Sequence, residues 1–190
     1  MKEYCMEVAG LKRCLPFVKI NDELAFASFV IISDTEMVAT AAPLLVNRIG
    51  ECDIIVTAEA KGIALAYEIS RLLGHKHFVV ARKSSKSYMT DTISVHVRSI
   101  TTFTDQQLLL DSKDAELVRG KKVCLVDDVV STGQSLQALK ELVEKAGATV
   151  VSNVCILAEG HAADRDDLIY LEKLPLFKKT GDGEYEVLDD

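Results

Sequence analysis

The sequence contains no apolar run that approaches the ~20 residues a helix needs to span a bilayer. Basic residues are also in deficit. With 22 Lys and Arg against 29 Asp and Glu, the net charge is −7, and no basic face for general nucleic-acid binding is expected. We therefore predict a protein that binds neither membrane nor nucleic acid, and that holds any anionic ligand by local features.

Cysteine and histidine are too scattered to indicate a zinc site or a disulfide framework. The five cysteines, at positions 5, 14, 52, 124 and 155, contain no Cys-x-x-Cys pair and leave one unpaired. The four histidines show no zinc-ligand spacing. We therefore predict reduced cysteines and a cytoplasmic location, with Cys124 and Cys155 as small core residues.

Residues 123–135, Val-Cys-Leu-Val-Asp-Asp-Val-Val-Ser-Thr-Gly-Gln-Ser, are the most informative stretch of the chain. The apolar start predicts a buried parallel strand, and ligands of open α/β sheets bind outside the carboxyl ends of such strands. Asp127 and Asp128 would therefore stand at the rim of a site. Hydroxyls, a glycine and unpaired helix-start amides follow, as in loops that bind phosphate. These loop residues are Ser131, Thr132, Gly133, Gln134 and Ser135.

Two carboxylates beside a phosphate loop would repel a ligand made only of phosphate, so sugar hydroxyls, a metal or developing positive charge should face them. Phosphoacceptor receiver domains also have a strand ending in Asp-Asp, but near the start of the domain, and the lack of Gly-Lys-Ser/Thr excludes a P-loop. The combination resembles the ribose-phosphate signature of type I phosphoribosyltransferases. The resemblance implies that Asp127 and Asp128 bind the ribose hydroxyls of phosphoribosyl pyrophosphate, and that the loop binds its 5-phosphate.

A second buried strand, predicted over residues 53–58, ends in the turn Glu59-Ala60-Lys61-Gly62. Alone, this turn is typical of a routine crossover into the helix predicted over residues 63–73. Beside the later motif it resembles the family's pyrophosphate loop, a short glycine-containing turn that often has a cis peptide and holds pyrophosphate through backbone groups. The resemblance assigns substrate binding to Glu59, Ala60, Lys61 and Gly62.

The third strand, predicted over residues 77–81, runs into the densest positive patch of this acidic chain, Arg82-Lys83-Ser84-Ser85-Lys86. A solvated loop is the ordinary alternative. However, departing pyrophosphate needs cations around it, and a mobile lid commonly supplies them. The family's catalytic loop begins here, which implies that Arg82 binds substrate and that Lys83 and Lys86 are catalytic. A β-hairpin from residues 92–102 and 107–110 is predicted to complete the lid.

The chain is long enough for one domain, and its four strand-to-helix steps predict a three-layer α/β fold, a parallel sheet flanked by helices. We expect residues 35–160 to form the core. The resemblance implies a small hood over the base from residues 1–34 and 160–190. Ser33 and Glu36 read as a capping box that opens a helix ending near Gly50. Residues 111–120 read as a polar connection.

The implied reaction is displacement of pyrophosphate by a ring nitrogen of a purine base, in purine salvage. Mg²⁺ would be carried by the substrate near the two acids, with no direct ligand from the chain. The family also implies a homodimer. The alternative is a regulator that binds phosphoribosyl pyrophosphate without turnover.

The base is less well specified than the chemistry. Ser131 stands where hypoxanthine-guanine enzymes usually have Asp, and residues 97–100 lack the lid Glu of adenine enzymes. Ile31 and Gly160 stand where xanthine enzymes often carry Asn and Lys. We rank adenine ahead of xanthine. His161, Arg165 and Phe177 could contact a base, but isolated residues of these types are usually surface or packing residues, and we favour that interpretation.

Overall fold

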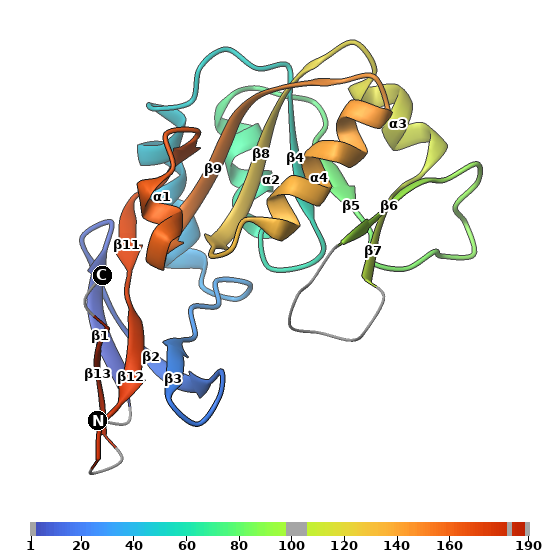
Figure 1. Cartoon of the computed structure of the whole chain (residues 1–190). Helices are drawn as coiled ribbons and strands as arrows, with labels where there is room; N and C mark the ends of the chain where they lie inside the picture. Colours follow the sequence, from blue (N-terminus) through green and yellow to red (C-terminus); the bar gives the residue numbers. More distant parts are fainter. Residues whose placement is uncertain (1–2, 98–105, 182–183, 189–190) are drawn as a thin grey trace.

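The computed structural model describes residues 3–97, 106–181 and 184–188. A central sheet of parallel strands forms the middle layer (Figure 1). Its strands, in spatial order, are β10 (Leu168–Ile169), β9 (Thr149–Glu159), β8 (Lys122–Val130), β4 (Ile54–Ala58) and β5 (Val79–Ala81), with β11 (Glu172–Leu174) also on β9. The predicted strands over residues 53–58, 77–81 and 123 onward are all present, and each begins within two residues of the predicted start.

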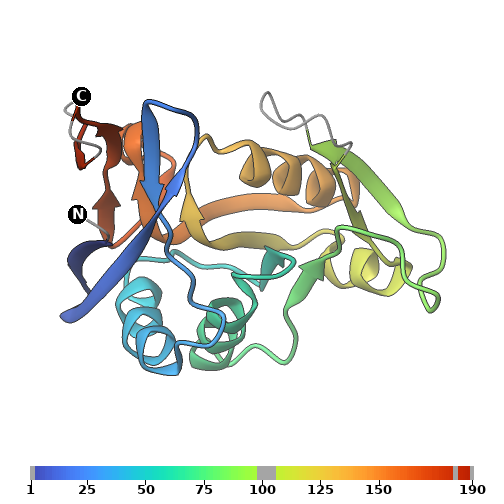
Figure 2. The same ribbon diagram turned by 90° about the horizontal axis from the view of Figure 1, so that it is seen from below.

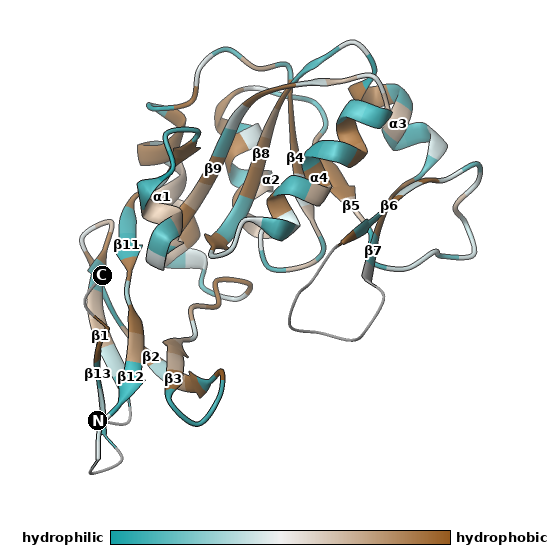
Figure 3. Ribbon diagram, in the orientation of Figure 1, coloured by the Kyte–Doolittle hydropathy of each residue, from teal (hydrophilic) through white to brown (hydrophobic). Residues whose placement is uncertain are grey.

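Helices cover both faces of the sheet, as Figure 2 shows. Helices α1 (Thr35–Val46) and α2 (Ile63–Leu72) lie on one face, and α4 (Gln134–Lys145) lies on the other. Alternation along the strands supplies the two cores: Ile55 packs with the α1 and α2 side, whereas Val56 packs with the α4 side. Strand β8 is apolar for most of its length and becomes hydrophilic near its carboxyl end (Figure 3). The predicted three-layer fold is confirmed.

A second, antiparallel sheet joins the two ends of the chain, in the order β1-β2-β3-β12-β13. Its strands are β1 (Glu3–Val8), β2 (Leu11–Lys19), β3 (Leu24–Ala27), β12 (Leu176–Lys179) and β13 (Tyr185–Val187). Phe177 is its buried centre, with ring centroids 4.9 Å from Tyr4 and 4.8 Å from Phe17. This sheet is the predicted hood, and Phe177 is a packing residue.

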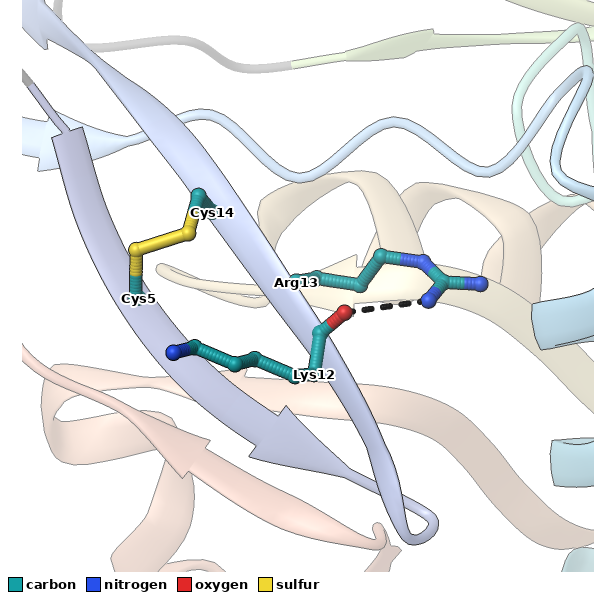
Figure 4. Close-up of a disulfide and its surroundings, with 4 residues drawn as sticks. All are labelled: Cys5, Lys12, Arg13 and Cys14. Carbon is teal, nitrogen blue, oxygen red and sulfur yellow. Dashed lines mark hydrogen bonds between the residues drawn. A yellow bond between two sulfur atoms is a disulfide. The ribbon is translucent and has the colours of Figure 1, made fainter.

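The prediction that all cysteines are reduced is wrong for one pair. Cys5 and Cys14 form a disulfide across the β1–β2 hairpin (Figure 4). They are directly paired residues on adjacent antiparallel strands, a register that no spacing in the sequence reveals. Cys124 and Cys155 are buried, as expected for core residues.

Two local predictions also need correction. Residues 111–120 contain a helix, α3 (Ser112–Val118), whose N-cap Asp111 accepts a hydrogen bond from the Ser112 amide. Helix α1 is capped by Asp34 rather than Ser33, because Asp34 Oδ1 accepts from the Met37 amide at 3.0 Å while Arg13 also binds that carboxylate. Both misses come from side-chain contacts of short acidic residues, which several neighbouring positions could have made.

The predicted hairpin is present as β6 (Ile93–Val97) and β7 (Gln106–Leu110), which pair in antiparallel register. A 3-10 turn, η1 (Gly160–Asp164), follows β9. Among the described residues, no helix is long and apolar enough to cross a membrane.

Candidate functional site

The acidic pair lies near the carboxyl end of β8, between β4 and β9. Asp128 is 1% exposed, and the Lys61 ammonium lies 3.0 Å from its Oδ2. This contact is an ion pair without hydrogen-bond alignment, since Oδ2 has no hydrogen-bond partner among the described residues. Asp127 Oδ1 accepts from the Asp128 amide at 2.9 Å. Lys61, in the turn after β4, therefore neutralises the charge of Asp128 but not that of Asp127.

Burial, and after it the adjacent charge of Asp128, together raise the pKa of Asp127 to about 7. Because this folded-state pKa lies above the unfolded value of about 3.9, ionisation of Asp127 opposes folding. The cost is absent below pH 4, grows between pH 4 and 7, and is complete above pH 7. The site thus keeps a carboxylate in an environment that disfavours its charge, which is common at functional sites.

We expect Asp127→Asn to raise the melting temperature by a few degrees at pH 8 and by much less at pH 5. The amide removes a charge that the fold disfavours only at the higher pH, and about 1 kcal/mol corresponds to roughly 2–4 °C for a chain of this size. Thermal unfolding at both pH values measures this, with the exposed Asp22→Asn as control. A lower melting temperature at pH 8 than the wild type would contradict the electrostatic argument.

The loop after β8 turns directly into α4. Gly133 is the N-cap of α4 with φ of 76°, a left-handed conformation that favours glycine, and no side chain caps the helix. Residues 131–135 line a small cavity together with Asp127. The Gln134 amide donates a long hydrogen bond, 3.5 Å, to Thr132 Oγ1. Amides and hydroxyls gathered at a helix start are suited to bind an anion. The five loop residues predicted from sequence therefore converge.

The turn after β4 packs closely against the strand that carries the acids. Gly62 leaves no room for a side chain: a Cβ there would lie 2.5 Å from Thr57 Oγ1 and 3.3 Å from both the Asp127 Cα and the Val126 carbonyl oxygen. The peptide between Glu59 and Ala60 is cis, a feature often seen in the turn it resembles. The turn thus presents its backbone beside Asp127 at the same edge of the sheet.

Glu59 connects this turn to the basic segment after β5. Its Oε2 accepts a hydrogen bond from the Lys83 amide at 3.0 Å, and Arg82 Nη1 lies 3.5 Å from its Oε1. The Lys83 amide is the main cause of the lowered pKa of Glu59, and the charges of Lys86 and Arg82 act in the same direction. The carboxylate predicted to bind substrate therefore also orders the start of the predicted lid.

One cavity collects most of these groups. Glu59, Ala60, Lys61, Lys83, Asp127, Asp128 and Ser135 line it, with Val97 and Gln107 from the hairpin β6–β7. Lys86 is not among the residues that line it. Its Nζ donates to Ser84 Oγ at 2.8 Å. Of the stretch 97–100, where the lid Glu was sought, residues 98–100 lie outside the described residues.

A larger cavity of about 650 Å³, a size typical of small-molecule sites, lies between the hood and the sheet edge. The hood contributes Phe26 and Phe29, and the sheet edge contributes Lys61, Thr132 and Glu159. Burial raises the pKa of Glu159, and no described residue is hydrogen-bonded to its carboxylate. Sequence reasoning missed Glu159, although its place at the end of β9 puts it at the same edge as the acidic pair.

Comparison with known proteins decides the family. The phosphoribosyl transferase domain family matches residues 34–176, three quarters of the chain. The chain belongs to the phosphoribosyltransferase family. It is 35% identical over 127 residues to the adenine phosphoribosyltransferase of Petrotoga mobilis, covering 66% of this chain and 69% of that one.

The similar phosphoribosyltransferases are named for different purine bases. The hypoxanthine/guanine phosphoribosyltransferase of Methanothermococcus okinawensis is 37% identical over 119 residues, 62% of this chain and 61% of its own length, so this chain spans less than two thirds of that relative. The crystal structure of adenine phosphoribosyltransferase from Thermoanaerobacter pseudethanolicus superposes with a TM-score of 0.66 at 20% identity, covering 84% of this chain and 95% of that one. The structural likeness supports the fold alone.

Two residues near this candidate site were assigned from sequence to surface or packing. His161 is exposed and lines the hood cavity. Arg165 lies against the loop, with its Nη1 where a Cβ on Gly133 would clash. Neither placement was evident from the residues alone, because the turn η1 brings both back to the sheet edge.

Proposed function

We propose that this chain transfers the phosphoribosyl group of phosphoribosyl pyrophosphate to a purine base, giving a nucleoside monophosphate and pyrophosphate in purine salvage. One observation carries the proposal. The acidic pair, the phosphate loop and the turn at residues 59–62 meet at one sheet edge, and Lys61 lines both the cavity there and the hood cavity. A pyrophosphate, a ribose and a base would fit this sequence of surfaces. The relatives named phosphoribosyltransferases support the same chemistry.

The proposed step breaks the bond from the anomeric carbon to pyrophosphate, which leaves with the bonding electrons, and forms a bond from that carbon to a ring nitrogen, which loses its proton to solvent. Positive charge develops on the ribose as the bond breaks. The negative charges of Asp127 and Asp128 would stabilise this positive charge, while their carboxylate oxygens accept hydrogen bonds from the ribose hydroxyls. The loop amides hold the 5-phosphate. Backbone groups of residues 59–62 hold the leaving pyrophosphate, together with Arg82, Lys83 and Lys86.

We propose Mg²⁺ as a cofactor bound with the substrate. Among the described residues, no cluster of three or more His, Cys, Asp or Glu side chains could hold a metal ion. The partly exposed Asp127 and the buried Asp128 would face a metal–pyrophosphate complex, which suits Mg²⁺ because this ion is usually bound by one or two carboxylates and substrate phosphates. When bound, the ion would neutralise charge on the departing pyrophosphate.

Adenine is the base we rank first. The Glu159 carboxylate lines the hood cavity and accepts hydrogen bonds when it is ionised. The exocyclic amine of adenine is a donor, whereas the corresponding position of hypoxanthine or xanthine is a carbonyl, which only accepts. Phe26 and Phe29 offer apolar rings in the same cavity. Hypoxanthine or guanine is the base we rank second, because some relatives are named hypoxanthine/guanine phosphoribosyltransferase. Xanthine is the base we rank third.

Incubation with phosphoribosyl pyrophosphate, Mg²⁺ and each of adenine, guanine, hypoxanthine, xanthine and orotate tests the proposal, with nucleotide products separated by chromatography. We expect adenosine monophosphate as the main product. A different purine nucleotide would overturn the base but keep the chemistry. No product from any base, with binding of phosphoribosyl pyrophosphate retained, would favour the regulator.

Lys83→Ala and Lys86→Ala are each expected to lower kcat by about 10-fold or more with adenine KM little changed, because a cation beside a leaving anion acts mainly in the transition state. Lys83 lines the cavity directly, so its effect should be the larger. Steady-state kinetics of both variants provide the test. Lys76→Ala, at an exposed position before β5, is the matched control. A kcat equal to that of the control in both variants would show that the basic segment at residues 82–86 has no role in the reaction.

We further propose one domain over residues 1–190, since a single apolar cluster joins hood residues such as Phe177 to Met37 and Ile55 of the core.

We propose a homodimer. An exposed apolar groove between α1 and α2, which includes Ile32 and Tyr67, supports this proposal. We also propose a cytoplasmic location. The Cys5–Cys14 disulfide weighs against it, since disulfides persist mainly in oxidising compartments.

A further inference from the structure

The phosphate loop carries no positive charge of its own. Residues 131–135 are Ser, Thr, Gly, Gln and Ser, and the chain as a whole is acidic. A phosphate monoester brings about −1.5 to −2 charges at pH 7. Loop amides and the start of α4 provide partial positive charge, about half an elementary charge for a whole helix. A full cation beside the loop would therefore matter for binding.

Arg165 is placed beside this loop. Its Nη1 occupies the space that a Cβ on Gly133 would need, so the guanidinium lies against the N-cap residue of α4. Its side chain is 34% exposed, which leaves it open to a ligand on the loop. Gly133 thus serves two purposes: it adopts the left-handed turn, and it leaves room for the arginine.

The orientation of the Arg165 side chain is fixed by Asp167 on the side away from the loop. Its Nε and Nη2 donate to Oδ1 and Oδ2 of Asp167, both at 2.9 Å. Asp167 in turn accepts from Asn153 Nδ2, at 3.1 Å on its carbonyl oxygen and 3.2 Å on Oδ2. Asn153 is 8% exposed within β9 and pairs in register with Leu168 of β10. Two guanidinium nitrogens are therefore held by the sheet, and the third is directed at the loop.

We propose that Arg165 binds the phosphate monoester of the substrate together with the loop amides, and that Asp167 and Asn153 are positioning residues for it. The inference rests on the proposed function and adds a specific residue to it. A planar guanidinium with one edge fixed by a carboxylate has a free edge that suits phosphate oxygens. Asp167 is suited to its part because the bonds from Arg165 lower the pKa of its carboxyl and keep it ionised.

The alternative is that Arg165 only braces the loop. Calorimetric titration with two separate probes distinguishes the two roles: ribose 5-phosphate, which carries the monoester, and pyrophosphate, which does not. In Arg165→Ala we expect ribose 5-phosphate to bind at least 10-fold more weakly and pyrophosphate to bind within 2-fold of wild type. Arg165→Lys should recover part of the loss, since it keeps the charge without the fork. Asp167→Asn should show a smaller loss of the same selectivity.

Three results would count against the proposal. Unchanged ribose 5-phosphate affinity in Arg165→Ala would exclude a contact with the monoester. Equal weakening of both probes with a lowered melting temperature would assign a bracing role. Full affinity for ribose 5-phosphate in Arg165→Lys would show that the planar guanidinium geometry is not needed. A wild-type protein that binds neither probe nor phosphoribosyl pyrophosphate would instead contradict the proposed function itself.

Discussion

Replacement of Asp127 and Asp128 together by Asn is expected to abolish turnover, lowering kcat by about 10³-fold or more while the protein stays folded. Losing one preorganised stabilising group commonly costs about 10²–10³-fold, and both carboxylates are aimed at the same developing charge. The fold should not suffer, because burial and the adjacent Asp128 charge oppose ionisation of Asp127, and because Lys61, which loses its partner Asp128, is half-exposed and stays hydrated. Initial rates with adenine and phosphoribosyl pyrophosphate, beside circular dichroism and thermal unfolding, measure both effects.

The two acids can also be compared singly. Asp128 is paired with Lys61, so Asp128→Asn leaves that ammonium without its partner beside the turn at residues 59–62. We therefore expect Asp128→Asn to weaken binding of phosphoribosyl pyrophosphate less than it lowers kcat, because the released cation attracts the anionic ligand. Near wild-type activity in the double variant, with the melting temperature retained, would show that the acidic pair is not part of the site.

Gly62→Ala is expected to have the second largest effect, with KM for phosphoribosyl pyrophosphate raised about 10-fold or more and kcat lowered. The added methyl group would lie 2.5 Å from Thr57 Oγ1 and 3.3 Å from backbone atoms of β8. Thr57 is fully buried and the strand backbone cannot yield, so the turn must move away from Asp127. Overpacking of this kind costs about 1–3 kcal/mol. Steady-state kinetics and denaturant unfolding measure the two consequences.

Gly50→Ala is the matched control, because a Cβ at Gly50 meets no atom within 4 Å. The double variant Thr57→Ala/Gly62→Ala removes the closest contact and should recover part of the lost activity. If Gly62→Ala behaved like the control, close packing of the turn on β8 would have no role in the site.

Much of the fold follows from local patterns in the sequence. The apolar runs that became β4 and β8 are continuous because both faces of a parallel strand are buried, and each is followed by an amphipathic run that became a helix. The site followed from the same order, since residues after parallel strands gather at one edge. The acidic pair, the loop at 131–135 and the turn at 59–62 are therefore predictable from the order of residues along the chain.

What could not be predicted depends on contacts between distant segments. The hood pairs β3 with β12, about 150 residues apart, and the short strands at both ends carry little pattern of their own. Arg165 reaches Gly133 only because β10 aligns with β9 and fixes Asp167. Such information is present in the sequence only through the complete fold.

The most direct test of the central claim is phosphorus NMR of the protein with phosphoribosyl pyrophosphate, Mg²⁺ and adenine. We predict that the pyrophosphoryl signals of the substrate disappear while free pyrophosphate and a nucleotide 5-phosphate appear in equal amounts, and that omission of adenine stops the reaction. An unchanged spectrum with every purine, or release of pyrophosphate at the same rate without any base, would contradict a phosphoribosyl transfer at this site.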